Sequence, residues 1–171
     1  QGYYCNTNGG LMKSTNGGTS WTRVRGTNGT TCSNGVDLGG ADIEENDDGD
    51  LFFSSSRPNG HIYISNKSTY GTNLGNSGNW ADITPSGSWE RIELGVSKKS
   101  GSSVLYAACE GSGYNDVTAI YYSSDKGANW TSRSVPTICD QGYYSVYTRS
   151  QAWYDLVVEI DPSDDATAYF G

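Results

Sequence analysis

The sequence has few of the residues on which many catalytic and metal sites depend. It contains one histidine, His61, and no nucleophile-elbow motif, so it does not indicate a serine, histidine and aspartate catalytic set. No Cys-x-x-Cys pair occurs among its four cysteines, and a single histidine adds little to them as a ligand set. A zinc site is therefore not indicated either.

Long apolar runs and clusters of basic residues are also missing. No segment approaches the roughly 20 apolar residues that a membrane-spanning helix needs. Aspartate and glutamate (19) outnumber lysine and arginine (11), which gives a net charge of −8. Without a basic patch to meet phosphates, nucleic acid is not expected as a partner. The chain starts at Gln1 with no initiator methionine or signal peptide, which we interpret as a processed terminus or an arbitrary cut.

Strand formers and turn formers dominate what the sequence does contain. It has 23 glycines and 13 tyrosines, and no long segment repeats apolar residues at helical spacing. Short apolar runs between Gly, Asn, Asp and Ser clusters predict an all-β protein. A length of 171 residues is enough for one domain with a hydrophobic core. Four cysteines in this composition are typical of an oxidised, extracellular protein.

One turn motif occurs twice in the chain. Residues 123–130 read Ser-Ser-Asp-Lys-Gly-Ala-Asn-Trp, and residues 14–21 repeat the pattern with Asn16 in place of Asp125. In both copies an Asp or Asn side chain can accept hydrogen bonds from nearby backbone amides, and a glycine can take the positive φ that the turn needs. Each copy therefore predicts two strands joined by a tight turn, with the tryptophan starting the return strand.

This pattern, Ser-x-Asp-x-Gly-x-x-Trp, resembles the Asp-box or BNR repeat of β-propellers such as sialidases, sortilin-like receptors and xyloglucan-active endoglucanases. The resemblance implies part of a β-propeller built from four-stranded antiparallel blades, with a box between strands C and D of a blade. It also implies that the boxes lie on the outer part of the blades, away from the ligand face. The matching positions are Ser14, Asn16, Gly18, Trp21, Ser123, Asp125, Gly127 and Trp130.

The resemblance also sets a blade register. Blade one is expected at 1–24 without its strand A, blade two at 41–84, blade three at 89–135, and strands A and B of blade four at 153–171. In blade two, a polar insertion between Ser65 and Trp80 is interpreted as a box with a lengthened turn. Since three to four blades with open ends cannot close a ring, we expect these residues to be part of a larger propeller.

In this register the cysteines occupy equivalent places in two blades. Cys5 and Cys109 fall at the ends of two strands B, and Cys32 and Cys139 fall in the connections that follow two strands D. Four cysteines allow three pairings. The repeat favours Cys5–Cys32 and Cys109–Cys139, each of which would tie a B–C loop to a D–A loop.

An acidic run between two expected strands raises the question of calcium. Asp47, Asp48 and Asp50 supply oxygen ligands of the kind that calcium prefers. The same run contains Asn-Asp-Asp-Gly, which is ordinary hairpin-turn chemistry, and turns occupy the equivalent place in the other blades. We favour the turn and otherwise expect no cofactor or metal.

Two sets of residues are candidates for function. Aromatic and basic residues near the D–A and B–C loops can stack on sugars or can pack between blades: Tyr143, Tyr144, Tyr147, Arg149, Trp153 and Trp89. Charged residues at the start of the expected strands A can ring a channel mouth: Asp42, Arg91 and Asp155. Asp42 and Asp155 are the candidate carboxylates for glycoside hydrolysis. An arginine triad of the sialidase kind cannot be placed.

Two functions remain open at this point. The first is a non-catalytic, extracellular or cell-surface module that binds glycans or proteins within a larger protein. The second is a fragment of a glycoside hydrolase of the xyloglucanase or sialidase kind. The segments Gly9–Gly18 and Gln151–Pro162 also resemble secreted propellers of Bacteroidetes, which implies a bacterial source and type IX secretion.

Overall fold

Two four-stranded antiparallel sheets form the centre of the protein, and in each the strands follow chain order. The computed structural model describes residues 10–26, 39–57, 59–113, 115–140 and 142–171. The first sheet contains β3 (Gly39–Glu45), β4 (Leu51–Ser56), β5 (Ile62–Ser65) and β6 (Ala81–Asp82). The second contains β7 (Trp89–Val96), β8 (Leu105–Gly111), β9 (Val117–Ser123) and β10 (Thr131–Arg133).

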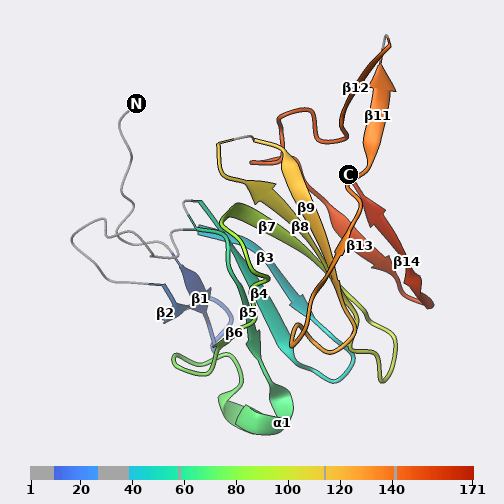
Figure 1. The fold of residues 1–171 in the computed structure, drawn as a ribbon. Coiled ribbons are helices and arrows are strands. Elements are labelled where there is room, and N and C mark those ends of the chain that lie inside the picture. The colour runs from blue at the N-terminus through green and yellow to red at the C-terminus, as the bar shows by residue number, and fades with distance from the viewer. Residues whose placement is uncertain (1–9, 27–38, 58, 114, 141) are drawn as a thin grey trace, which may run out of the picture.

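Three two-stranded sheets flank this pair (Figure 1). They are β1 (Leu11–Lys13) with β2 (Thr22–Arg25), β11 (Thr137–Asp140) with β12 (Tyr143–Val146), and β13 (Val158–Asp161) with β14 (Asp164–Phe170). Helical structure among the described residues is limited to α1 (Lys67–Tyr70) and the 3-10 turn η1 (Gly71–Asn73). The all-β prediction is confirmed. No helix in the described part of the chain is long and apolar enough to cross a membrane.

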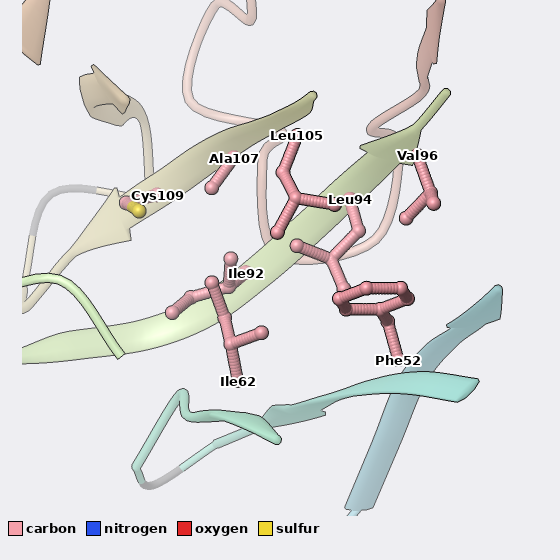
Figure 2. Packing of buried hydrophobic residues seen from close by; sticks show 8 residues of the cluster. All are labelled: Phe52, Ile62, Ile92, Leu94, Val96, Leu105, Ala107 and Cys109. Atoms are coloured by element: carbon pink, nitrogen blue, oxygen red, sulfur yellow. The ribbon is translucent and has the colours of Figure 1, made fainter. Parts of the chain in front are cut away.

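The strand β7 is covered on both faces, and this arrangement creates the core. Side chains alternate along a strand, so Ile92 and Leu94 point to one face, where they pack with Phe52 of β4 (Figure 2). On the other face, a Cβ added to Gly95 would lie 2.9 Å from Val158 Cγ1, so β13 approaches β7 closely. Each fully buried side chain of this size contributes about 1.5–3 kcal/mol.

The insertion in the first sheet keeps the hydrogen bond from a glycine amide to a serine hydroxyl that the turns at 14–21 and 123–130 contain. The Ser65 hydroxyl accepts a hydrogen bond from the amide of Gly75 at 2.8 Å, across ten residues of chain. Between them lie α1, which Asn66 caps by accepting from the Thr69 amide at 3.1 Å, and η1. The polar residues 66–74 therefore extend the turn between β5 and β6.

The cysteines differ from the expected pairing. Cys109 and Cys139 are both free thiols, so the predicted bridge between them is not formed in this structure. Cys109 lies within β8 and points into the core beside Ile92 rather than toward a loop, whereas Cys139 is exposed on β11. Burial raises the pKa of the Cys109 thiol. The other expected pair, Cys5 with Cys32, lies outside the described residues.

Candidate functional site

The two ends of the stacked sheets carry different loops. Because neighbouring strands are antiparallel, the Asp-box turns lie at the same end as the turns between the first two strands of each sheet. The opposite end, called here the loop end, gathers Arg57, Asn115 and residues 147–155. Arg57 Nη2 donates to Asn115 Oδ1 at 2.7 Å, and the Ala152 amide donates to the Asn115 carbonyl at 2.9 Å. Three segments that are distant in sequence therefore meet there.

The second box forms the expected hydrogen-bonded turn. The Ser123 hydroxyl accepts from the Gly127 amide at 2.9 Å, and Asp125 Oδ1 accepts from the Asn129 amide at 2.8 Å. The hydrogen bonds from Asn129, from its side chain first and then from its amide, hold the pKa of Asp125 below its usual value. The turn chemistry is therefore local to the motif.

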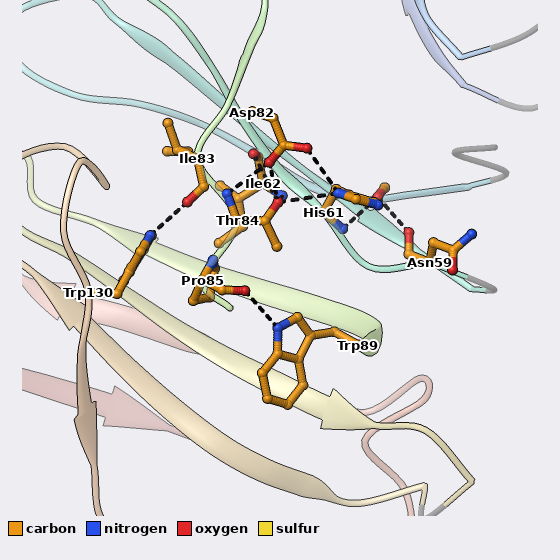
Figure 3. Close-up of polar contacts among 10 residues, drawn as sticks. Asn59, His61, Ile62, Asp82, Ile83, Thr84, Pro85, Trp89 and Trp130 are labelled. Carbon is orange, nitrogen blue, oxygen red and sulfur yellow. Dashed lines mark hydrogen bonds and ion pairs between the residues drawn. The ribbon is translucent and has the colours of Figure 1, made fainter. Parts of the chain in front are cut away.

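The first box makes the same pair of hydrogen bonds with asparagine in place of aspartate. The Gly18 amide donates to Ser14 Oγ at 2.8 Å, and the Ser20 amide donates to Asn16 Oδ1 at 2.9 Å. The two boxes differ in what surrounds them: Trp21 is 60 % exposed, whereas Trp130 donates from Nε1 to the Ile83 carbonyl at 2.7 Å (Figure 3). In the second box the tryptophan is therefore bonded to the backbone just after β6, and no such bond from Trp21 occurs among the described residues.

The end of the sheets opposite the loop end is called here the box end. There, a lysine of the turn at 123–130 pairs with carboxylates of the acidic run. Lys126 Nζ lies 2.7 Å from both Asp48 Oδ2 and Asp50 Oδ2, and the Lys67 amide donates to Asp50 Oδ1 at 2.7 Å. Asp50 is buried, while Asp47 is exposed. Burial alone would raise the pKa of Asp50, but the hydrogen bonds from Lys126 and Lys67 outweigh it and lower that pKa. Asp48 and Asp50, two of the three carboxylates considered for calcium, thus have an ammonium group as their cation here.

At the loop end, two aromatic side chains are exposed next to each other. Trp153 is 51 % and Tyr154 is 52 % exposed, and their ring centroids lie 4.1 Å apart. We call this pair the aromatic platform. Arg149, four residues before Trp153, is also exposed.

The other predicted aromatic residues are placed differently. Tyr147 packs against a core cluster, and burial raises its pKa to about 12. Trp89 is half-buried and donates from Nε1 to the Pro85 carbonyl at 3.1 Å (Figure 3). Tyr143 and Tyr144 belong to β12, in a hairpin rather than the expected loop, and their side chains lie outside what is described. Tyr147 and Trp89 thus have structural roles in packing and do not form part of an exposed aromatic surface.

The predicted carboxylates separate, and a different acid joins Asp42. Asp155 is exposed, and among the described residues no hydrogen bond or ion pair joins it to Asp42. Glu93 of β7 lies near Asp42 and Glu44 of β3 and is bonded to Arg91 at 2.7 Å. Burial, and then the Glu44 charge, raises the pKa of Asp42.

Glu93 is the acid that sequence reasoning missed. Burial is the largest effect on its pKa, and it outweighs the lowering by Arg91. The charges of Asp42 and Glu44 add to the rise, and the pKa reaches about 6. The alternation of β7 could have indicated this residue, because Glu93 follows Arg91 by two positions and so shares its face. The proximity to β3 could not be read from the sequence.

The raised pKa of Glu93 predicts how the stability of the fold depends on pH. Because the pKa rises from 4.5 to about 6 on folding, stability should fall as the pH increases through this window. The shift corresponds to about 2 kcal/mol for this group. We expect Glu93→Gln to remove that decrease, so that the variant gains relative to wild type between pH 4.5 and 7. Urea denaturation at both pH values measures this, and a pH-independent difference between the two proteins would contradict it.

A second buried acid lies beneath the loop end. Glu110 of β8 is fully buried and pairs through Oε1 with Arg57, which also lies 3.0 Å from Glu90 Oε2. The other carboxylate oxygen of Glu110, Oε2, has no hydrogen-bond partner among the described residues. Burial raises the pKa of Glu110, and the hydrogen bond from Arg57 opposes that rise. This network fixes Arg57, and through it Asn115, at the loop end.

The single histidine lies in the arrangement closest to a catalytic triad, but its geometry is different. His61 Nδ1 lies 3.1 Å from Asp82 Oδ2 and 3.3 Å from Thr84 Oγ1 (Figure 3). Both contacts use the same ring nitrogen, whereas a triad places the nucleophile and the acid on opposite nitrogens. The Thr84 hydroxyl also donates to Asp82 Oδ1 at 2.5 Å. This cluster therefore connects β5 to β6 without activating a nucleophile.

Comparison with known proteins finds no matching family model and no significant match among curated proteins. Within the described ranges, no group of three or more His, Cys, Asp or Glu side chains is arranged to hold a metal ion. The loop end and the carboxylates on β3 and β7 are therefore the features of this structure that bear on function.

Proposed function

We propose that this chain is a module of a secreted or cell-surface β-propeller that binds glycans or proteins at its loop end, as a non-catalytic part of a larger protein. Support for the fold comes from the two Asp-box turns and from two sheets of four strands in chain order that pack face to face. Such repeated sheets resemble propeller blades.

The observation that carries the binding function is the aromatic platform. Single exposed apolar side chains are common on protein surfaces, but adjacent exposed aromatic rings form a larger apolar patch of the kind that marks recognition surfaces. Trp153 and Tyr154 are both about half-exposed and lie at the end of the sheets where loops from three segments converge. The flat faces of such rings suit the C–H faces of sugars and the side chains of proteins.

A binding screen tests this function. We expect the wild-type protein to bind at least one member of a panel of soluble polysaccharides, sialosides and surface proteins. Trp153→Ala should weaken that binding about tenfold or more, since truncation of a central aromatic contact costs at least 1–2 kcal/mol. Trp21→Ala is the matched control, because Trp21 is 60 % exposed at the box end. Equal losses in both variants, or no binding across the panel, would reject the proposal.

Glycoside hydrolysis is the second candidate, and the pair of Asp42 and Glu93 favours it. A partly buried carboxyl whose pKa burial raises to about 6 suits a general acid, and the carboxylate of Asp42, whose charge adds to that rise, suits its partner. Turnover of xyloglucan or a sialoside that Glu93→Gln and Asp42→Asn both abolish would support hydrolysis. The same turnover retained in both variants would exclude these residues.

A further inference from the structure

The backbone beside the aromatic platform is strained. Four non-glycine residues in the described part of the chain have positive φ, and three of them lie at the loop end: Asn115 (56°), Arg149 (49°) and Ser150 (61°). Asparagine tolerates this conformation, whereas arginine and serine adopt it uncommonly and need surroundings that hold it. Two such residues in succession, at 149 and 150, therefore need a partner that holds the turn.

Asp116 is that partner. Its Oδ1 accepts from the Ser150 amide at 2.5 Å and from the Thr148 hydroxyl at 2.9 Å, and its Oδ2 accepts from the Ser150 hydroxyl at 3.2 Å. The Thr148 hydroxyl in turn accepts from the Val117 amide at 3.2 Å, and Thr148 is buried. One carboxylate thus connects the start of β9 to both ends of the strained turn.

The strained turn leads directly into the platform. The Gln151 amide donates to the Thr148 carbonyl at 2.9 Å, and the Gln151 carbonyl accepts from the Tyr154 amide at 3.1 Å. Between them Ala152 is fully buried, and its amide donates to the Asn115 carbonyl. The direction in which Trp153 and Tyr154 leave the surface is therefore set by the turn that Asp116 holds.

We propose that Asp116 is a positioning residue for the aromatic platform, which it keeps in a ligand-ready arrangement before any ligand arrives. This inference rests on the proposed binding function. A preorganised site does not have to order its loop when it binds, and this raises affinity without adding a contact. Asp116 itself lies behind the turn and acts through Ser150.

Amide hydrogen exchange on the unliganded protein tests the positioning role. We expect Asp116→Ala to speed exchange across residues 147–155 by about tenfold or more while β7 and β8 stay protected. Asp116→Asn should remain close to wild type, because an amide oxygen can still accept from the Ser150 amide and the Thr148 hydroxyl. Unchanged exchange at 147–155 in Asp116→Ala, or faster exchange throughout both sheets, would overturn the proposal.

A rescue experiment separates backbone strain from the loss of a charge. Glycine adopts positive φ without strain, so Ser150→Gly in the Asp116→Ala background should restore slow exchange at 147–155. Asp125→Ala is the matched control, since Asp125 holds a similar turn at the box end and should leave the platform unchanged. A double variant that exchanges as fast as Asp116→Ala would contradict the role assigned to the turn.

Binding adds a second, distinguishable result. With cellohexaose and 3′-sialyllactose as neutral and acidic probes, Asp116→Ala should bind about tenfold more weakly than wild type, and the added Ser150→Gly should recover most of the loss. Full affinity in Asp116→Ala would overturn the proposal. If the wild-type protein binds neither probe, this counts against glycan binding by the platform. Faster exchange at 147–155 in Asp116→Ala would then still support the effect of Asp116 on the turn.

Discussion

Replacing Gly127 by alanine is expected to destabilise the protein by about 3 kcal/mol. Gly127 has a φ of 84°, and a Cβ at this position would lie 2.6 Å from Ile83 Cδ1 in the preceding sheet. The left-handed backbone contributes about 1 kcal/mol of this cost, and overpacking against Ile83 contributes about 2 kcal/mol. The midpoint of urea denaturation should fall with an unchanged slope.

Gly18 is the matched control for this prediction. It occupies the same position of the first box with a φ of 86°, but an added Cβ would meet only Trp21 Cζ2 at 3.6 Å, an ordinary contact. Gly18→Ala should therefore cost about 1 kcal/mol, the backbone part alone. Equal losses in the two variants would mean that the second box does not press against Ile83.

Replacing Lys126 by methionine is expected to cost about 3 kcal/mol at neutral pH. The ammonium group bonds both Asp48 and the buried Asp50, and removing one partner of a buried pair typically costs 3–5 kcal/mol. The partial exposure of Lys126 places the expected value at the lower end of this range. Since the folded protein lowers the pKa of Asp50, this stability is present at neutral pH and is lost as the pH falls through that lowered pKa.

The difference between Lys126→Met and wild type should therefore shrink below about pH 4, where Asp50 becomes protonated in the unfolded chain. Lys99→Met provides the control, because Lys99 is half-exposed and lies 4.0 Å from Asp165. It should change stability by at most about 0.5 kcal/mol. A loss of that small size in Lys126→Met would refute the pairing described for Asp50.

Local patterns predicted the strands of the two central sheets and the two repeated turns, but not the hairpin of β11 and β12, which was expected to be a loop. The apolar runs that became β4, β7 and β8 were recognisable because strand periodicity and flanking turn residues are properties of neighbouring positions. The turns at residues 14–21 and 123–130 were predictable for the same reason. In both of them a serine hydroxyl and an Asx side chain bond amides within four residues of the same chain.

Predictions that depended on which face a side chain takes were less successful. Along a strand one extra residue turns every later side chain to the other face, and bulges lie between Gly40 and Asp42, between Trp89 and Arg91, and between Cys109 and Glu110. Cys109 itself lies before the bulge in β8 and follows Leu105 and Ala107 at a spacing of two, so it shares the core face with them. Repeat symmetry alone had placed it in a loop-side bridge.

The sequence by itself determined an all-β protein, two turns held by a serine and an Asx side chain, and an acidic chain, because these features depend on composition and short-range hydrogen bonding. Tertiary structure decided that the charge of Asp42 acts on Glu93, that Lys126 meets Asp50, and that Asp116 holds the turn beside the platform. Each of these interactions joins residues more than 30 positions apart. They form only when stacked sheets bring distant strands together, and no local pattern encodes that distance.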